Sequence, residues 1–149
     1  MQYWEHVAEI PPDGDGTFLE GASPGAAFNV ALAALDLAPC ERIVGVAAAL
    51  CWRNTSSAAG RAVLHVGTAE QATGNFSPST TYDTVFVFAR NSPATGKPWT
   101  WAEVNAARVG GVVYTGAGLR ATQARLHVFL HTAPVQITRK ELPMNFRAL

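Results

Sequence analysis

The sequence predicts an all-β protein: an antiparallel β-sandwich of the jelly-roll-like kind, with one short capped helix near residues 101–108. Three observations predict this fold. Short apolar runs are separated by Gly, Pro, Ser and Thr, a spacing typical of sandwiches and barrels. One long segment near the end alternates between apolar and polar residues, as a half-buried strand does. The length, 149 residues, is that of a single domain.

The expected strands are apolar runs bounded by turn residues. In chain order they cover Tyr3–Ile10, Thr17–Glu20, Ala26–Ala33, Arg42–Arg53, Arg61–Gly67, Thr84–Arg90, Gly111–Thr115, Leu119–Thr132 and Val135–Lys140. The third run is ambiguous, because its apolar residues also fit a helical stripe. A strand is preferred there, since Gly25 and Pro39 bracket the run and its neighbours are β.

Three of these strands differ in the faces they bury. The segment Leu119–Thr132 is apolar on one face and mostly polar on the other: Ala124, Leu126, Val128 and Leu130 against Gln123, Arg125, His127, Phe129 and His131. In contrast, Ile43–Trp52 and Val85–Phe88 are apolar on both faces. Such strands are expected to be central, with a helix, a loop or a neighbouring molecule over their outer faces.

The helix has a clear start signal. Thr100 and Glu103 form a Thr-x-x-Glu capping box, in which each side chain binds a backbone N–H at the other residue. Trp99 before the cap and Val104 at the fourth helical position have the spacing of a hydrophobic staple. About two turns are too few for a stable isolated helix. We therefore expect Trp99 and Trp101 to anchor it to the sheet edge.

The end of the helix is expected at Gly110 and Gly111, because glycine commonly terminates helices.

The amino-acid composition indicates that other molecules cover much of the surface. Only 15% of the residues are charged, against about 25% in typical domains, while 48% are hydrophobic. Eleven basic residues balance eleven acidic ones, which argues against a dedicated nucleic-acid binder. A surface this poor in charge is expected to be covered by other molecules.

The sequence contains no motif for a transmembrane span, a signal peptide, a nucleotide or a cofactor. Its most apolar stretch, Ile43–Trp52, is about half the length a bilayer requires. His127 and His131 would lie about 13 Å apart on one strand, too far to share a zinc ion without a bend. The run Asp13–Gly16 is interpreted as a turn rather than a calcium loop. We therefore expect no metal, no cofactor, no membrane contact and no catalytic residue.

The cysteines and the tryptophans are two further sets of candidate residues. Cys40 and Cys51 are too far apart along an extended strand for an internal disulfide, so buried thiols are expected, with a bridge between chains left open. Four tryptophans, Trp4, Trp52, Trp99 and Trp101, could form a platform for a sugar. Packing roles are preferred for Trp52, which lies in an apolar strand, and for Trp99, which belongs to the staple.

The segment Ser92–Gly110 resembles a pattern found in small structural proteins of tailed-bacteriophage virions. That pattern reads Pro-x-Thr-Gly-x-x-Trp-Thr-x-x-x-Val-Asn, and here it begins at Pro93. Looser landmarks extend the resemblance over residues 13–131: Gly14-Asp15 with Phe18, Ser23-Pro24-Gly25, Ile43–Asn54 and Gly60-Arg61. The chain departs from the pattern after its central strand, where Asn54–Ser57 replaces the usual acidic Lys-Asp-Asp turn.

The resemblance implies a non-enzymatic structural component of a virion, tail or collar associated, that is assembled in the host cytoplasm. Its partners would be copies of itself and other virion proteins, with no direct contact to nucleic acid. A capsid decoration or fibre-base protein is an alternative, and so is a carbohydrate- or receptor-binding module that contacts a host-surface glycan. A hydrolase is a third reading, for which the sequence offers no motif.

Residues 1–132 are expected to form the sandwich domain, and residues 133–149 a C-terminal arm that docks on a neighbouring subunit. The arm combines widely spaced apolar residues with basic ones. These are Arg139, Lys140, Met144, Phe146, Arg147 and Leu149.

Overall fold

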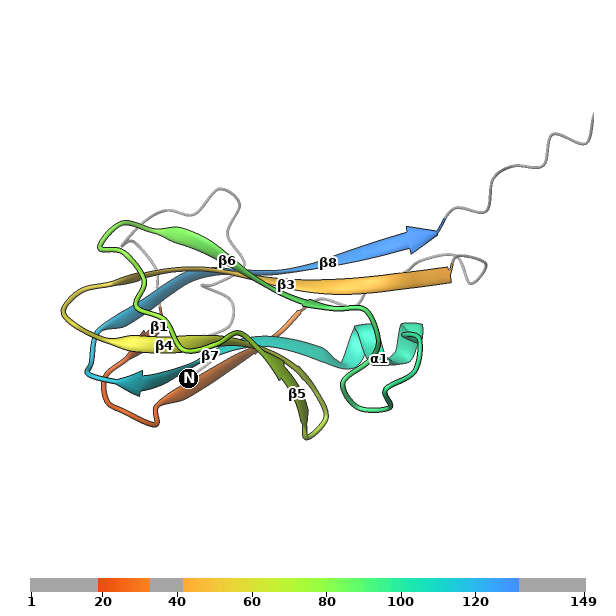
Figure 1. Cartoon of the computed structure of the whole chain (residues 1–149), viewed down its shortest axis with the longest axis horizontal. Helices are drawn as coiled ribbons and strands as arrows, with labels where there is room; N and C mark the ends of the chain where they lie inside the picture. Colours follow the sequence, from red (N-terminus) through yellow and green to blue (C-terminus); the bar gives the residue numbers. More distant parts are fainter. Residues whose placement is uncertain (1–18, 33–41, 132–149) are drawn as a thin grey trace, which may run out of the picture.

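The computed structural model describes residues 19–32 and 42–131. Within them, eight strands form two four-stranded antiparallel sheets that pack face to face (Figure 1). The elements are β1 (Leu19–Gly21), β2 (Ala27–Ala31), β3 (Arg42–Asn54), β4 (Ala59–Val66), β5 (Ala69–Ala72), β6 (Asp83–Ala89), α1 (Trp101–Ala106), β7 (Ala107–Thr115) and β8 (Leu119–His131). The predicted all-β sandwich is confirmed.

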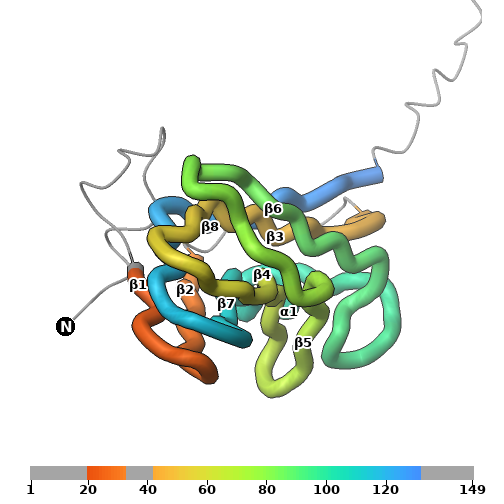
Figure 2. Tube along the Cα trace, turned by 60° about the vertical axis from the view of Figure 1, so that its left-hand side comes forward, coloured from red at the N-terminus to blue at the C-terminus, as the bar shows by residue number. Residues whose placement is uncertain are grey.

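The strand order is that of a jelly roll. One sheet has the order β1-β8-β3-β6 and the other β2-β7-β4-β5. The first strand pairs with the eighth, the second with the seventh, the third with the sixth and the fourth with the fifth. A long antiparallel ribbon has therefore been rolled so that alternate pairs lie in opposite sheets. Figure 2 shows the two layers from another side, with β3, β6 and β8 above β4, β5 and β7.

Two β-bulges in the pairing of β3 with β8 keep apolar side chains directed into the core. Val44 is the extra residue of the first bulge, so that Ile43 and Val46 are both buried although they are three positions apart. Thr122 is the extra residue of the second, on β8. A bulge shifts the alternation of faces by one residue, which lets a long strand continue to face one core. After the second bulge, β8 shows the predicted alternation.

The core between the sheets is filled by apolar side chains from both. Trp52 is its largest fully buried residue, and its ring meets that of Phe76 edge-on with 5.2 Å between centroids. Leu50 on β3 and Leu64 on β4 are fully buried. Burying each such side chain contributes about 1.5–3 kcal/mol. Packing of these apolar side chains therefore holds the two sheets against each other.

The two strands that are apolar on both faces are both predicted to be central in a sheet, and the structure confirms this for one of them only. The prediction for Ile43–Trp52 is confirmed, since β3 lies between β8 and β6. The prediction for Val85–Phe88 is wrong, because β6 is an edge strand. Val87 packs into the core, whereas Phe86 and Phe88 point outward and are 57% and 56% exposed.

The predicted helix end is also wrong. Helix α1 stops at Ala106, and β7 begins at the next residue, so Gly110 and Gly111 lie inside a strand. Their role is steric. A Cβ atom on Gly110 would stand 2.2 Å from the backbone oxygen of Phe28 on β2. Glycine is therefore required by the close approach of two strands rather than by a helix end.

No sequence pattern predicts strand β5. It reads Ala-Glu-Gln-Ala, lacks apolar alternation and forms the edge of its sheet, next to β4. Gly67, with a φ of +61°, allows the tight turn that brings β5 beside β4. In the ambiguous third run the structure has a strand, β2, as preferred. The expected strands Tyr3–Ile10 and Val135–Lys140, and the arm at 133–149, lie outside the described residues.

Candidate interaction surface

The helix start has the geometry of a capping box. The hydroxyl oxygen of Thr100 accepts a hydrogen bond from the backbone N–H of Glu103 at 3.3 Å, and the Glu103 carboxylate accepts one from the backbone N–H of Thr100 at 2.9 Å. The hydroxyl of Thr100 is also 2.8 Å from the same carboxylate oxygen, and Thr95 donates to the other oxygen at 3.1 Å. The carboxylate therefore holds the preceding loop against the helix.

These hydrogen bonds affect the acidity of Glu103. Partial burial raises the pKa of its carboxyl, but hydrogen bonds from Ser92, Thr100 and Thr95 favour the ionised form and together outweigh burial. The pKa of Glu103 is consequently lowered. Since its oxygens are engaged with the loop and the cap, the group has the role of a structural anchor.

The two staple residues are buried in the core that the sheets share. Trp99 is 5% exposed and Val104 is 3% exposed. The indole Nε1 of Trp99 donates a hydrogen bond to the backbone oxygen of Ala89, at 3.0 Å. Trp101 is half-buried and packs against the same core. The helix is thus tied to the end of the edge strand β6, and the segment that carries the family resemblance forms a packed corner.

Backbone hydrogen bonds within the loop before the helix hold its shape. Ser92 is buried, and its N–H donates to the backbone oxygen of Lys97 at 2.9 Å, while the N–H of Gly96 donates to the oxygen of Ser92 at 2.8 Å. Gly96 has a φ of +67°, a conformation that favours glycine. The glycine of the resembling pattern is therefore explained by turn geometry, and its threonine by the hydrogen bond from Thr95 to Glu103.

The described tryptophans do not form an exposed platform. Trp52 and Trp99 are almost fully buried, and Trp101, the first residue of α1, is half-buried. Trp4 lies outside the described residues, as do Cys40, the Asp13–Gly16 run and all six arm residues. In residues 19–32 and 42–131 no group of three or more His, Cys, Asp or Glu side chains is placed to hold a metal ion. In the same residues no helix is long and apolar enough to cross a membrane.

The prominent surface feature is a row of rings on the outer face of the sheet that contains β3, β6 and β8. We call it the aromatic face and define it as Phe86 and Phe88 on β6 with His127 and Phe129 on β8. The centroids of Phe88 and Phe129 are 5.9 Å apart with the rings edge-on, and those of Phe86 and His127 are also 5.9 Å apart. Phe129 is 47% exposed.

Small residues on the intervening strand create this arrangement. Ala47 on β3 pairs with Phe88 on one side and with His127 on the other. Gly45 has no side chain, and the Phe88 ring occupies that space: a Cβ atom there would stand 2.8 Å from it. Rings from two strands can therefore meet across the strand between them. Ala47 is only 5% exposed although it points outward, because the rings shield it.

Cys51 lies on the same outer face, toward the other end of β3. Its thiol is free, and the residue is 6% exposed. Burial raises the pKa of the Cys51 thiol, and this effect exceeds the opposing effects of a hydrogen bond with Thr84 and of the nearby positive charge of Arg125. A raised pKa means little thiolate at neutral pH, so Cys51 is unsuited to be a nucleophile.

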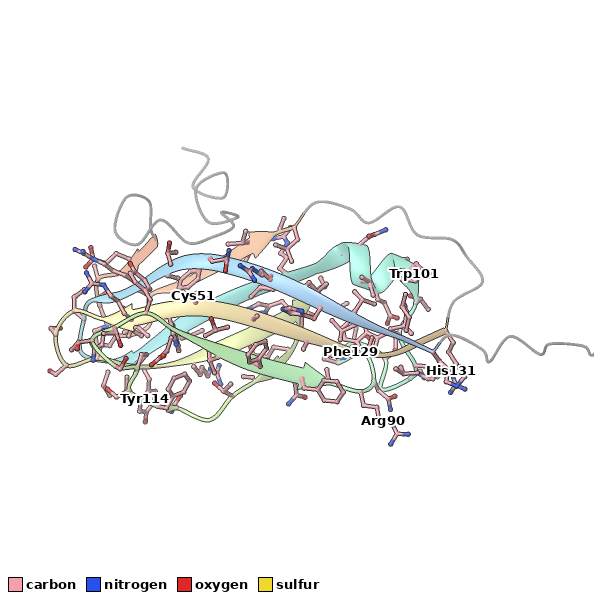
Figure 3. All side chains as sticks on the ribbon, turned by 90° about the horizontal axis from the view of Figure 1, so that it is seen from above. Cys51, Arg90, Trp101, Tyr114, Phe129 and His131 are labelled. Atoms are coloured by element: carbon pink, nitrogen blue, oxygen red, sulfur yellow. The ribbon has the colours of Figure 1, made fainter. Side chains whose placement is uncertain are left out.

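The sequence contained part of the signal for this surface. Alternation along β8 placed His127 and Phe129 on its outer face, as the structure shows. The apolar run Val85–Phe88 predicts apolar side chains on both faces of its strand, as the structure has them, but it predicts a central strand where the structure has the edge strand β6. The placement of β6 and β8 on either side of a strand of small residues depends on strand order, which the sequence pattern does not reveal. Figure 3 shows Phe129 at the end of the molecule where His131 and Arg90 lie, and Tyr114 toward the other end.

Comparison of the chain with protein-family profiles, with curated proteins and with solved structures finds no match in any of the three.

Proposed function

We propose that the chain is a non-enzymatic structural subunit of a tailed-bacteriophage virion, associated with the tail or collar, which joins its neighbours through the aromatic face. The observation that carries this proposal is the exposure of three phenylalanine rings, at 57%, 56% and 47%, on one sheet face. Covering a half-exposed ring contributes roughly 1 kcal/mol, about half the value for a fully exposed one. An exposed apolar sheet face of this kind fits another polypeptide surface.

Two further observations support the proposal. The packed corner at residues 92–110 is the segment that resembles small virion structural proteins. The jelly-roll strand order also recurs in viral capsid domains, although the same fold is found in lectins and cupins. Fold alone does not assign a function, so the proposal depends on the exposed face and on the resemblance together.

The test is incorporation into particles. Tailed particles purified from cells that make the chain are analysed by quantitative mass spectrometry, and the chain is located on them with an antibody and electron microscopy. We expect a fixed copy number and a position at the tail or collar. Absence of the chain from purified particles would overturn the proposal, and a position on the capsid surface or at a fibre base would correct its location.

Substitutions in the aromatic face test whether incorporation into particles depends on it. In Phe88→Ser together with Phe129→Ser, the face loses two rings that are not part of the core, and we expect at least a tenfold loss of incorporation. Tyr114→Ser is the matched control, because Tyr114 is 60% exposed on a strand of the other sheet. Equal incorporation of both variants would show that the aromatic face does not join subunits.

The C-terminal arm remains part of the proposal. Deletion of residues 141–149 removes Met144, Phe146, Arg147 and Leu149 and is expected to leave a folded monomer that does not assemble. Normal incorporation of the truncated chain would remove the arm from the proposal.

The alternative is a carbohydrate-binding module, favoured by the lectin-like strand order and by the exposed rings. Sugar platforms present ring faces to the ligand, whereas Phe88 and Phe129 meet edge-on. A glycan array probed with the full chain separates the two functions: saturable binding that is lost in Phe88→Ser favours the module, and no binding favours the subunit.

A further inference from the structure

We infer that, in the isolated subunit, the aromatic face is the docking site of the chain's own N-terminal segment, residues 1–18. This goes beyond the proposed function, and it stands or falls independently of it. It concerns what covers the face before any neighbour does. Three observations carry it: the charge around the face, the charge and apolar content of the segment, and the direction in which β1 enters the sheet.

Basic side chains surround the aromatic face. By strand alternation and register, Arg125 and His131 on β8 and Arg42 on β3 project from the same outer face, and Arg90 follows β6 directly. Strands β3 and β8 contain no Asp or Glu, and β6 contains Asp83 alone, at its opposite end. The Nε atom of Arg125 is buried and has no hydrogen-bond partner among the described residues. An acidic, apolar ligand would match this surface.

The chain contains such a ligand. Seven of its eleven acidic residues and none of its eleven basic residues lie in residues 1–41. Within residues 1–18 the acidic residues are interleaved with large apolar ones: Glu5, Glu9, Asp13 and Asp15 with Tyr3, Trp4, Val7, Ile10 and Phe18. The two parts of one chain therefore have opposite charge. The attraction strengthens when the apolar rings that the segment covers exclude water from the contact.

The connection to β1 leads to the face. β1 is antiparallel to β8, with Leu19 beside Ala121 and Gly21 beside Leu119. The chain therefore enters β1 from the side on which Phe129 lies, about 26 Å further along β8. Eighteen residues can span up to about 60 Å. From Thr122 to His131, the edge of β8 away from β3 pairs with no described strand, so no described strand lies along that edge between β1 and the aromatic face.

Docking within one chain is favoured over docking between chains. A tethered segment that can reach its site has an effective concentration in the millimolar range, well above that of a second molecule in dilute solution. A neighbouring subunit would have to displace the segment in order to use the face. The segment would thus protect the exposed rings from non-specific association.

The test uses the full-length chain with a photo-crosslinking amino acid. Phe88 is replaced by p-benzoylphenylalanine, which keeps an aromatic ring at an exposed position, and the dilute protein is irradiated and mapped by mass spectrometry. We expect crosslinks to residues 1–18 within a species of monomer mass. The same substitution at Tyr114, on the other sheet, is the matched control and is expected to give no crosslink to residues 1–18.

Charge is tested with a second variant. Neutralising Glu5, Glu9, Asp13 and Asp15 to their amides changes no described residue, and circular dichroism checks that the variant keeps the β-sheet signal of the parent. We expect the crosslink yield from position 88 to fall at least fivefold in this variant and to fall similarly for the parent in 1 M salt, where charges are screened beyond about 3 Å.

Four outcomes would overturn the inference. They are crosslinks only to other parts of the chain, crosslinks to residues 1–18 found only in dimers, a yield unchanged by neutralisation and salt, and crosslinks to nucleic acid retained through purification. The last would identify the basic face as a polyanion site. None of them bears on particle incorporation, so failure of this inference and failure of the proposed function are distinguishable.

Discussion

The indole N–H of Trp99 donates a hydrogen bond to the backbone oxygen of Ala89. This hydrogen bond joins the start of the helix to the last residue of β6. Both residues are almost fully buried. The substitution Trp99→Phe removes the donor and leaves a small void, and we expect it to lower the free energy of unfolding by about 1–2 kcal/mol. Urea denaturation measures this. A change below about 0.3 kcal/mol would show that the bond contributes little.

The capping box makes a second, separate contribution to the free energy of unfolding. Replacing Thr100 and Glu103 together by alanine leaves N–H groups at the helix start without their partners, and we expect a loss of about 1–2 kcal/mol. The same denaturation experiment measures it. The single Thr100→Gly variant is the control, because glycine is tolerated at the cap and should cost only a few tenths of a kcal/mol.

The lowered pKa of Glu103 predicts a pH dependence. Because the folded-state pKa lies below the unfolded-state value of about 4.3, the carboxylate stabilises the fold at pH values above 4.3. That contribution is lost as the pH falls through the lowered folded-state value. Glu103→Gln keeps the hydrogen bond to the cap but cannot ionise. We expect the parent to have the higher melting temperature at pH 7 and the two to converge at low pH. A difference independent of pH would contradict this assignment.

Gly110 tests the close approach of β7 to β2. Gly110→Ala forces a methyl group against the backbone oxygen of Phe28, and backbone gives way less readily than a side chain. We expect a loss of at least about 3 kcal/mol. Gly74→Ala is the matched control, since Gly74 is exposed and a Cβ there would have no atom within 4 Å. It should stay within about 0.5 kcal/mol of the parent. Similar stability of the two variants would contradict the packing described for β2 and β7.

Cys51 should be unreactive in the folded state. Burial both shields its sulfur and raises its pKa, so the thiolate is scarce. In a Cys40→Ser background we expect a disulfide reagent at pH 7.5 to react with Cys51 at least about tenfold more slowly than in 6 M guanidinium, where the thiol is exposed. Equal rates in the two solvents would show that the outer face of β3 opens readily.

Local sequence patterns determined most of the elements. The alternation from Ala124 to Leu130 and the capping residues Thr100 and Glu103 are local patterns, and the structure shows the strand and the helix start that they predict. Local patterns succeed because alternation along a strand and caps at a helix end involve residues only a few positions apart. β5 had no such pattern, because an edge strand of polar residues has no apolar side to reveal it.

Strand order was decided by the tertiary structure alone. Phe88 and Phe129 are far apart in the sequence, and they meet only because β3 lies between their strands and has small residues at the crossing. The sequence at Gly110 predicts a helix end, whereas in the structure glycine is required there because β2 lies beside it. Both features depend on which strands become neighbours, and that choice is set by how all the apolar faces pack into one core. The sequence alone therefore determined that the chain is a β-sandwich, and only its folding determined which rings remain on the outside.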